Sequence, residues 1–99
     1  MNEQEFLKLQ SEGKKIVAVF SANLCGPCRM FSPIFDKVAS GGQFANITFV
    51  KLDVDNCQSL CKSYGIQSIP TIIFFDGNKP TKEHLGGFPN EQKFIEWLV

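Results

Sequence analysis

One continuous apolar segment near the N-terminus constrains the fold of this chain more than any other feature. Ile16–Phe20 consists entirely of apolar side chains, most of them β-branched, which is typical of a strand that is covered on both faces. The segment is far too short to cross a bilayer. Apolar residues at spacings of three and four then recur over Pro27–Ala39, which predicts an amphipathic helix. A buried strand followed by a helix indicates a layered α/β structure.

Gly, Pro and Asn residues divide the rest of the chain into segments that fit single secondary-structure elements. We expect further helices over 3–12, 56–64 and 90–98, and strands over 47–54, 71–75 and 82–85. The strand–helix–strand unit predicts a parallel, right-handed crossover, and the turn at 76–78 predicts an antiparallel hairpin. The order αβαβαββα therefore predicts one α/β domain over residues 1–99, a mixed four-stranded sheet with helices on both faces.

The same spacing predicts which helical side chains face the core. They are Phe6, Leu7, Leu9 or Gln10, Met30, Phe31, Ile34, Phe35, Val38, Phe94, Ile95 and Leu98. Asn2 is a predicted N-cap for the first helix, and Asp55 or Asn56 for the short third one. Gly13 and Gly65 are expected to end these two helices.

The composition excludes several classes of partner. Ten Lys and Arg balance ten Asp and Glu, so the formal net charge is zero, and nothing indicates binding to nucleic acid or to an anionic membrane. Met1–Glu5 shows neither the basic nor the apolar region of a signal peptide. We therefore expect a cytoplasmic protein, in a compartment where structural disulfides are rare, so chemistry is the first role to consider for its cysteines.

Cys25-Gly26-Pro27-Cys28 lies between the buried strand and the long helix. Backbone N–H groups and the helix dipole at this position favour a thiolate at Cys25, and only the thiolate attacks a disulfide. Two intervening residues bring Cys28 close enough to attack the mixed disulfide that results. Pro27 fits the first helical turn, and Gly26 leaves the approach to Cys25 open. The motif suits reversible two-electron dithiol exchange.

Half of a zinc site is the alternative interpretation of this motif. The other half would have to come from Cys57 and Cys61, or from His84. The motif opens a long amphipathic helix rather than a hairpin turn, and this position disfavours zinc.

A second motif is Ile69-Pro70-Thr71, at the start of the third predicted strand. A proline there cannot donate to a sheet ladder and marks an edge or a strand start. The Ile69–Pro70 bond is a candidate for the cis form, with an ordinary trans proline as the alternative.

Taken together, these motifs closely resemble the thioredoxin family from about residue 6 to residue 98. The matching segments occur in the family's order and spacing: 20–22 before the Cys25–Cys28 motif, 51–55, 64–66, 69–71, the 76–78 turn and Gly86. The pairing of a CxxC motif with a βαβ pattern is a known signature of this family. The resemblance implies the thioredoxin fold, without the short N-terminal strand of longer members.

The resemblance also implies an activity, partners and a docking surface. The expected function is reduction of protein disulfides, with Cys25 and Cys28 catalytic and no bound cofactor. Reducing equivalents would come from NADPH through a flavoprotein thioredoxin reductase, and we expect a monomer. Pro70 would be cis and would leave the backbone of Ile69 free to pair with substrate. The substrate-docking surface that the resemblance implies consists of Leu24, Gly26, Pro27, Val54, Ile69, Pro70, Leu85, Gly86 and Gly87. A redox-switched interaction module without enzymatic activity is the alternative.

The chain departs from the family pattern at two positions near the motif. Val19 stands where most thioredoxins carry a buried Asp, and Leu24 stands where they usually carry Trp. Lys51, which normally lies near that Asp, is therefore expected to lack a counter-charge and to tune the electrostatics of the site. We expect Cys25 to be more acidic, and Cys28 to attack more slowly, than in a relative with the Asp.

Cys57 and Cys61 are four residues apart on the predicted short helix. On a regular helix their Cβ atoms would be about 5–6 Å apart, too far for an undistorted disulfide. They are therefore either small packing thiols or, for Cys57 near the helix N-cap, a reactive regulatory thiol open to dimerisation or glutathionylation.

Overall fold

The computed structural model describes residues 1–99, and its elements follow the order predicted from the sequence. Four α-helices, four strands and one short 3₁₀ helix are present. Their bounds are α1 Glu3–Ser11, β1 Lys15–Ser21, α2 Gly26–Ser40, β2 Ile47–Asp53, η1 Val54–Asn56, α3 Gln58–Ser63, β3 Thr71–Asp76, β4 Lys79–Leu85 and α4 Glu91–Leu98.

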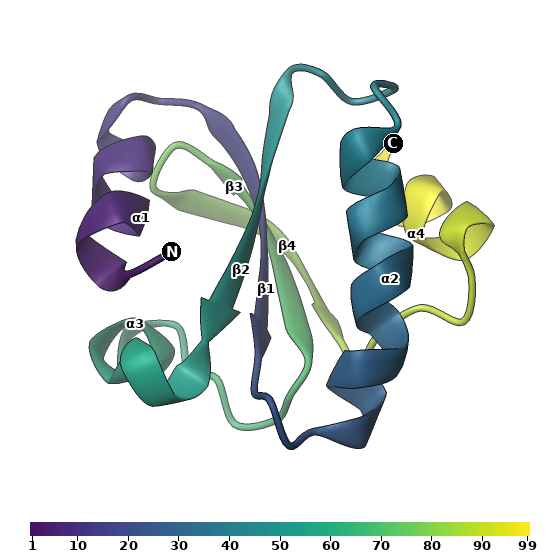
Figure 1. Ribbon diagram of the computed structural model, residues 1–99. Coiled ribbons are helices and arrows are strands. Elements are labelled where there is room, and N and C mark those ends of the chain that lie inside the picture. Colours follow the sequence, from purple (N-terminus) through teal and green to yellow (C-terminus); the bar gives the residue numbers. More distant parts are fainter.

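The mixed sheet has the strand order β2-β1-β3-β4. β1 pairs in parallel with β2 and antiparallel with β3, and β4 pairs antiparallel with β3. Figure 1 shows α1 and α3 on one face of this sheet and α2 and α4 on the other. The sequence prediction of a four-stranded mixed sheet between two helical layers is confirmed.

Both faces of β1 are covered, which explains its unbroken apolar sequence. Ile16, Ala18 and Phe20 belong to the cluster beneath α1 and α3, whereas Val17 and Val19 belong to the cluster beneath α2 and α4. All five side chains are at most 4% exposed. Because successive side chains of a strand point to opposite faces, each half of the core depends on alternate residues of this one strand.

Two predicted core positions are wrong. Leu7 is 47% exposed and Met30 is 77% exposed. The buried residues of α1 are Phe6 and Gln10, and the side-chain amide of Gln10 donates to the Tyr64 hydroxyl at 3.1 Å. On α2 the buried stripe is centred on Phe31, Phe35 and Val38, so Met30 lies outside it.

Two element boundaries also differ from the prediction. The segment after β2 begins as the 3₁₀ helix η1, where the Asp53 side chain accepts from the N–H of Asp55. α3 therefore starts only at Gln58, with Cys57 as an N-cap that makes no side-chain capping hydrogen bond. β4 starts at Lys79 instead of residue 82, because Pro80 is accommodated opposite Phe75 beside a register shift on the edge strand.

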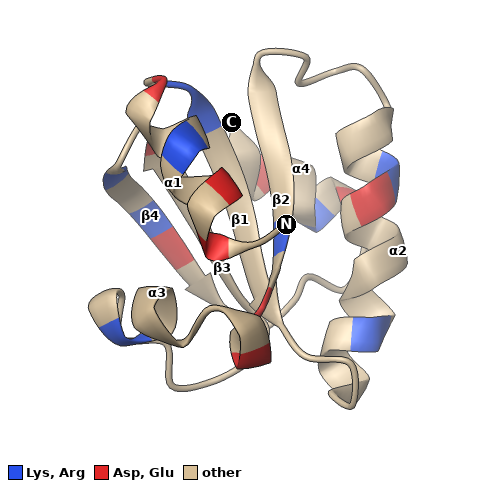
Figure 2. Cartoon of the chain, turned by 60° about the vertical axis from the view of Figure 1, so that its left-hand side comes forward, with Lys and Arg blue, Asp and Glu red and all other residues tan.

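The surface carries both signs of charge. In the view of Figure 2, Lys and Arg are interspersed with Asp and Glu over α1, α2 and β4. No helix combines the length and the apolar composition needed to pass through a bilayer.

Candidate active site

The Cys25–Cys28 pair lies at the point where β1 leads into α2. The two residues form a disulfide, with 5.2 Å between their Cα atoms. Cys25 is the N-cap of α2, and its Sγ accepts a hydrogen bond from the N–H of Cys28 at 3.2 Å. No acidic residue occupies the first turn of α2, so the positive end of the helix dipole acts on this sulfur uncompensated. In the reduced protein these groups favour a thiolate at Cys25.

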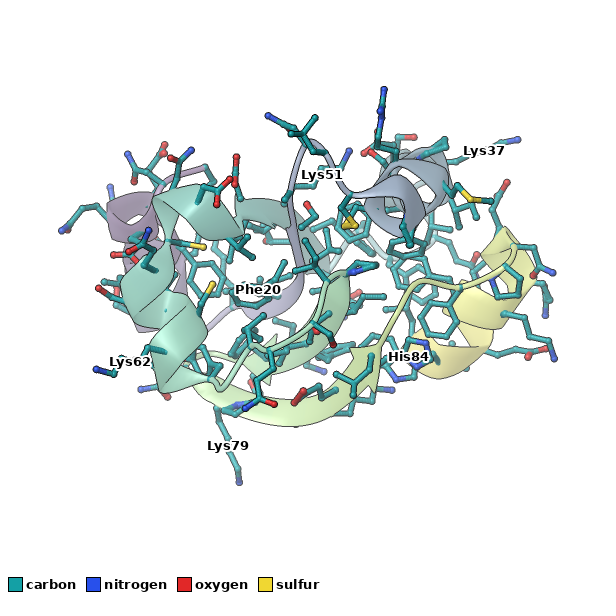
Figure 3. The ribbon with its side chains drawn as sticks, turned by 90° about the horizontal axis from the view of Figure 1, so that it is seen from below. Phe20, Lys37, Lys51, Lys62, Lys79 and His84 are labelled. Carbon is teal, nitrogen blue, oxygen red and sulfur yellow. A yellow bond between two sulfur atoms is a disulfide. The ribbon has the colours of Figure 1, made fainter.

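The two sulfurs of the pair differ in accessibility. Cys25 is half-buried and Leu24 before it is 96% exposed, whereas Cys28 is only 6% exposed. Figure 3 shows the disulfide at the end of α2 near Lys51. An incoming disulfide can therefore reach Cys25, whereas Cys28 is positioned to react with the sulfur of Cys25.

The loop before β3 approaches the pair from the other side. The Ile69–Pro70 peptide bond is cis, and the carbonyl oxygen of Ile69 lies 3.9 Å from the Cys25 Sγ. Pro70 is buried, and its carbonyl accepts from the N–H of Gly86 at 2.8 Å. The backbone hydrogen bonds outside the regular elements include none from Ile69. The backbone of Ile69 is thus held beside Cys25 without a hydrogen bond to any other backbone group.

Lys51 is not the uncompensated cation that the sequence suggested. Its Nζ lies 2.7 Å from a carboxylate oxygen of Asp36 and donates to the Ser32 Oγ at 2.6 Å. Ser32 and Asp36 follow Cys28 on α2 at steps of four, so the three residues share one helix face. The four-residue spacing of Cys28, Ser32 and Asp36 is the sequence signal for this arrangement.

A cavity of about 540 Å³ opens beside the buried sulfur. Its lining is largely polar and includes Cys28, Ser32, Lys51 and Asp53. Water and mobile protons therefore have room next to Cys28, although Val19 supplies no carboxylate there.

The residues expected to contact substrate differ in their exposure. Leu24 and Leu85 are strongly exposed, at 96% and 66%. Val54, Ile69, Gly86 and Gly87 are partly exposed, and Pro70 is buried beneath them. The single tryptophan, Trp97, lies elsewhere, in α4 against Phe88 and Phe94.

Cys57 and Cys61 lie apart from the active-site pair. Cys57 is 2% exposed, and burial, followed by its contact with Cys61, raises the pKa of its thiol from 9.0 to about 12. This argues against Cys57 as the sulfur that first meets an oxidant. His84 stacks on Phe88 instead of joining the cysteines. No three His, Cys, Asp or Glu side chains gather into a metal-binding group, so the zinc alternative has no ligand set.

Comparison with known proteins agrees with this geometry. The family profile described as Thioredoxin matches residues 1–99. The thioredoxin of Mycoplasmoides gallisepticum is 42% identical over 91 residues, which cover 92% of this chain and 89% of that protein. The bifunctional thioredoxin reductase/thioredoxin of Mycobacterium leprae is 37% identical over 81 residues, 82% of this chain and 18% of that protein. The X-ray structure of Fasciola hepatica thioredoxin superposes with a TM-score of 0.83 at 30% identity, covering 98% of this chain and 91% of that one.

The site combines a half-exposed Cys25 at a helix N-terminus, a buried Cys28 and a cis proline. The chain that carries it matches one family profile along its whole length. The chain therefore belongs to the thioredoxin family and is a thiol–disulfide oxidoreductase.

Proposed function

We propose that this chain reduces protein disulfides with Cys25 as the attacking thiolate and Cys28 as the resolving thiol. The Cys25 thiolate attacks one sulfur of a substrate disulfide, which breaks the substrate S–S bond and releases one substrate thiolate. Cys28 then loses its proton and attacks the Cys25 sulfur. The second substrate thiolate leaves, the Cys25–Cys28 disulfide forms, and the substrate has gained two electrons.

The observation that carries this proposal is the unequal exposure of two bonded sulfurs at one helix N-terminus. Only Cys25 is open to a large substrate, and it is also the sulfur that caps α2 and receives the N–H of Cys28. The same amides stabilise the thiolate form of Cys25, and only the thiolate attacks the substrate disulfide.

The substrate surface is proposed to work through backbone pairing as well as apolar contact. The N–H and carbonyl groups of Ile69, which bond to no other backbone group, can bond to an extended substrate segment, which is recognition by strand addition. Gly26, Pro27, Gly86 and Gly87 are proposed to complete this surface. The exposed side chains of Leu24, Val54 and Leu85 supply apolar contact. Main-chain pairing tolerates many sequences, which suits a general reductase.

We further propose that a thioredoxin reductase, a flavoprotein that uses NADPH, returns the pair to the dithiol. The relative from Mycobacterium leprae, named for both activities in one protein, supports this partner. Within the family scheme the chain itself binds no cofactor, acts as a monomer in a single domain over 1–99, and works in the reducing cytoplasm. Lys51, held by Asp36, is proposed to set the electrostatics of the cavity beside Cys28.

Reduction of insulin disulfides by the protein with NADPH and a thioredoxin reductase tests the proposal. We expect activity in the wild type, none in Cys25→Ser, and a stable mixed disulfide with substrate in Cys28→Ser. Cys61→Ser is the matched control and should keep wild-type activity. Insulin reduction that survives Cys25→Ser would overturn the assignment, and no activity in the wild type would favour an interaction module.

A further inference from the structure

A second pair of sulfurs is in contact on the opposite side of the molecule from α2. The Sγ atoms of Cys57 and Cys61 are 3.8 Å apart, and neither cysteine is in a disulfide. In Figure 3, sulfur atoms without a bond between them lie along α3, the helix that carries Lys62. The proposed reduction of substrates uses neither of these thiols.

The local backbone allows the two sulfurs to come closer than the sequence suggested. The expected Cβ separation assumed that both residues lie within a regular helix. Cys57 instead precedes α3 as its N-cap, with φ −141° and ψ 49°, and its side chain caps nothing. Closing the remaining distance to the roughly 2.05 Å of an S–S bond requires rotation of the two side chains and adjustment of the first turn of a six-residue helix.

The two thiols differ in their access to a reactant. Cys61 is half-buried and lines a cavity of about 370 Å³ together with Gln58 and Ser68. Cys57 is buried beneath it, and its thiol donates to the carbonyl oxygen of Asp53 at 3.1 Å. A small oxidant can therefore reach Cys61, whereas Cys57 can be reached only by its neighbour.

We propose that Cys57 and Cys61 form a second dithiol–disulfide couple that is entered at Cys61. A low-molecular-weight disulfide such as glutathione disulfide is the oxidant. The Cys61 thiolate attacks it, forms a mixed disulfide and releases one thiolate. Cys57 then gives up its proton and attacks the Cys61 sulfur, which closes the Cys57–Cys61 bond and releases the second small thiol. Two electrons pass from the protein to the oxidant, which leaves as two thiols.

This couple is slower than the one at the N-terminus of α2, because its entry sulfur lies within α3 instead of capping a helix and its resolving thiol donates to the Asp53 carbonyl. It does not depend on the proposed function, since none of its atoms belongs to the Cys25–Cys28 pair.

Mass spectrometry of the full chain carrying Cys25→Ser and Cys28→Ser tests the couple in isolation. The variant is incubated with glutathione disulfide, digested with trypsin under conditions that prevent exchange, and examined for the peptide 52–62, which contains both cysteines. We expect this peptide to lose two hydrogens and to carry no glutathione at the end of the reaction. Persistence of a glutathione adduct, or no reaction, would overturn the couple.

Two further variants in the same background test the order of attack. With Cys57→Ser added, Cys61 should accumulate as a stable glutathione adduct. With Cys61→Ser added, the buried Cys57 should react at least tenfold more slowly than Cys61 does in the first variant. Equal rates would show that entry is not through Cys61. Circular dichroism of each variant, compared before oxidation, shows that the chain remains folded.

Discussion

At the scale of single residues, position 19 carries no carboxylate, and Lys51 pairs instead with Asp36. Val19 pairs with Lys51 in the register of β1 and β2, and Val19 is buried in the apolar cluster under α2. The Lys51 ammonium therefore finds its partners outward, at Asp36 and Ser32. The expectation that Cys25 is made more acidic by an unpaired Lys51 loses its basis. The expectation for Cys28 does not depend on that pairing.

The substitution Val19→Asp tests whether Cys28 resolves slowly for lack of a nearby base. A carboxylate next to Lys51 in the register would stand near the cavity that Cys28 lines and could accept the Cys28 proton. We expect the rate at which a Cys25 mixed disulfide is resolved to rise about a hundredfold, the lower end of the range usual for a positioned base. Rapid mixing with a chromogenic disulfide measures this step.

Val19→Asn is the matched control, because it introduces a polar side chain of nearly the same shape without a base. The same acceleration in Val19→Asn, or none in Val19→Asp, would contradict the role of the carboxylate.

The thiol of Cys57 should make stability fall at high pH. Its pKa is raised from 9.0 in an unperturbed thiol to about 12 in the folded chain, mainly by burial. The folded state therefore holds this proton more tightly than the unfolded state. The stabilisation is complete below pH 9.0 and is lost as the pH rises toward 12. Urea unfolding at about 1.5 pH units above the unperturbed value should show a loss of about 2 kcal/mol from this group.

Comparison with Cys57→Ala isolates this contribution from the other groups that titrate in the same range. Both proteins carry Cys25→Ser and Cys28→Ser and are kept in a non-thiol reductant. Cys57→Ala should be less stable at neutral pH and should lose less stability as the pH rises. Parallel pH profiles for the two proteins would disprove the raised pKa.

At the scale of elements, the sequence predicts best where a periodic apolar pattern and a capping residue coincide. α1 starts at Glu3 because Asn2 and Glu5 form a capping box, and β1 occupies the apolar run. The predicted start of α3 is two residues too early, because Asp55 and Asn56, its predicted N-caps, lie in the 3₁₀ helix η1. That outcome depends on the Asp53 side chain and on tertiary packing, which periodicity does not contain. The start of α2 at the Cys25–Cys28 motif was predictable from the apolar periodicity of the helix that follows. The partners of Lys51 were not predicted.

The loop between β4 and α4 is held against α2 at one close contact. A Cβ on Gly87 would lie 2.8 Å from the Cβ of Phe31, a residue that is 2% exposed. Gly87→Ala should therefore force either the loop or the buried Phe31 to move, and overpacking of this kind costs about 1–3 kcal/mol. Urea unfolding gives the free energy directly.

Gly26→Ala serves as the comparison for stability, because a Cβ there meets nothing within 4 Å. It should change the unfolding free energy by less than about 0.5 kcal/mol, as is usual for an open surface position. If Gly87→Ala were no more destabilising than Gly26→Ala, the loop between β4 and α4 could move away from Phe31 without a measurable cost in stability.

At the scale of the whole molecule, redox chemistry and the fluorescent probe lie at separate places. The Cys25–Cys28 disulfide is at the start of α2, whereas Trp97 is packed in α4 against Phe74, Phe88 and Phe94. The two elements share the cluster under α2 and α4. Trp97 should therefore report loss of the core on unfolding while its native fluorescence changes little between the oxidised and reduced forms.

This separation allows the effect of the active-site disulfide on stability to be measured with one probe. The bond closes a very short loop, for which the chain-entropy relation gives about 2 kcal/mol of stabilisation. Urea unfolding followed by Trp97 fluorescence should thus show a higher midpoint for the oxidised protein at the same slope. The measurement uses a protein with Cys57→Ser and Cys61→Ser, in which only the Cys25–Cys28 disulfide can form. In the control, which also carries Cys25→Ser and Cys28→Ser, the urea midpoint should be the same under oxidising and reducing conditions. A large change in native fluorescence on reduction would contradict the remote position of Trp97. Equal midpoints would contradict the stabilisation expected from the lower conformational entropy of the cross-linked unfolded chain.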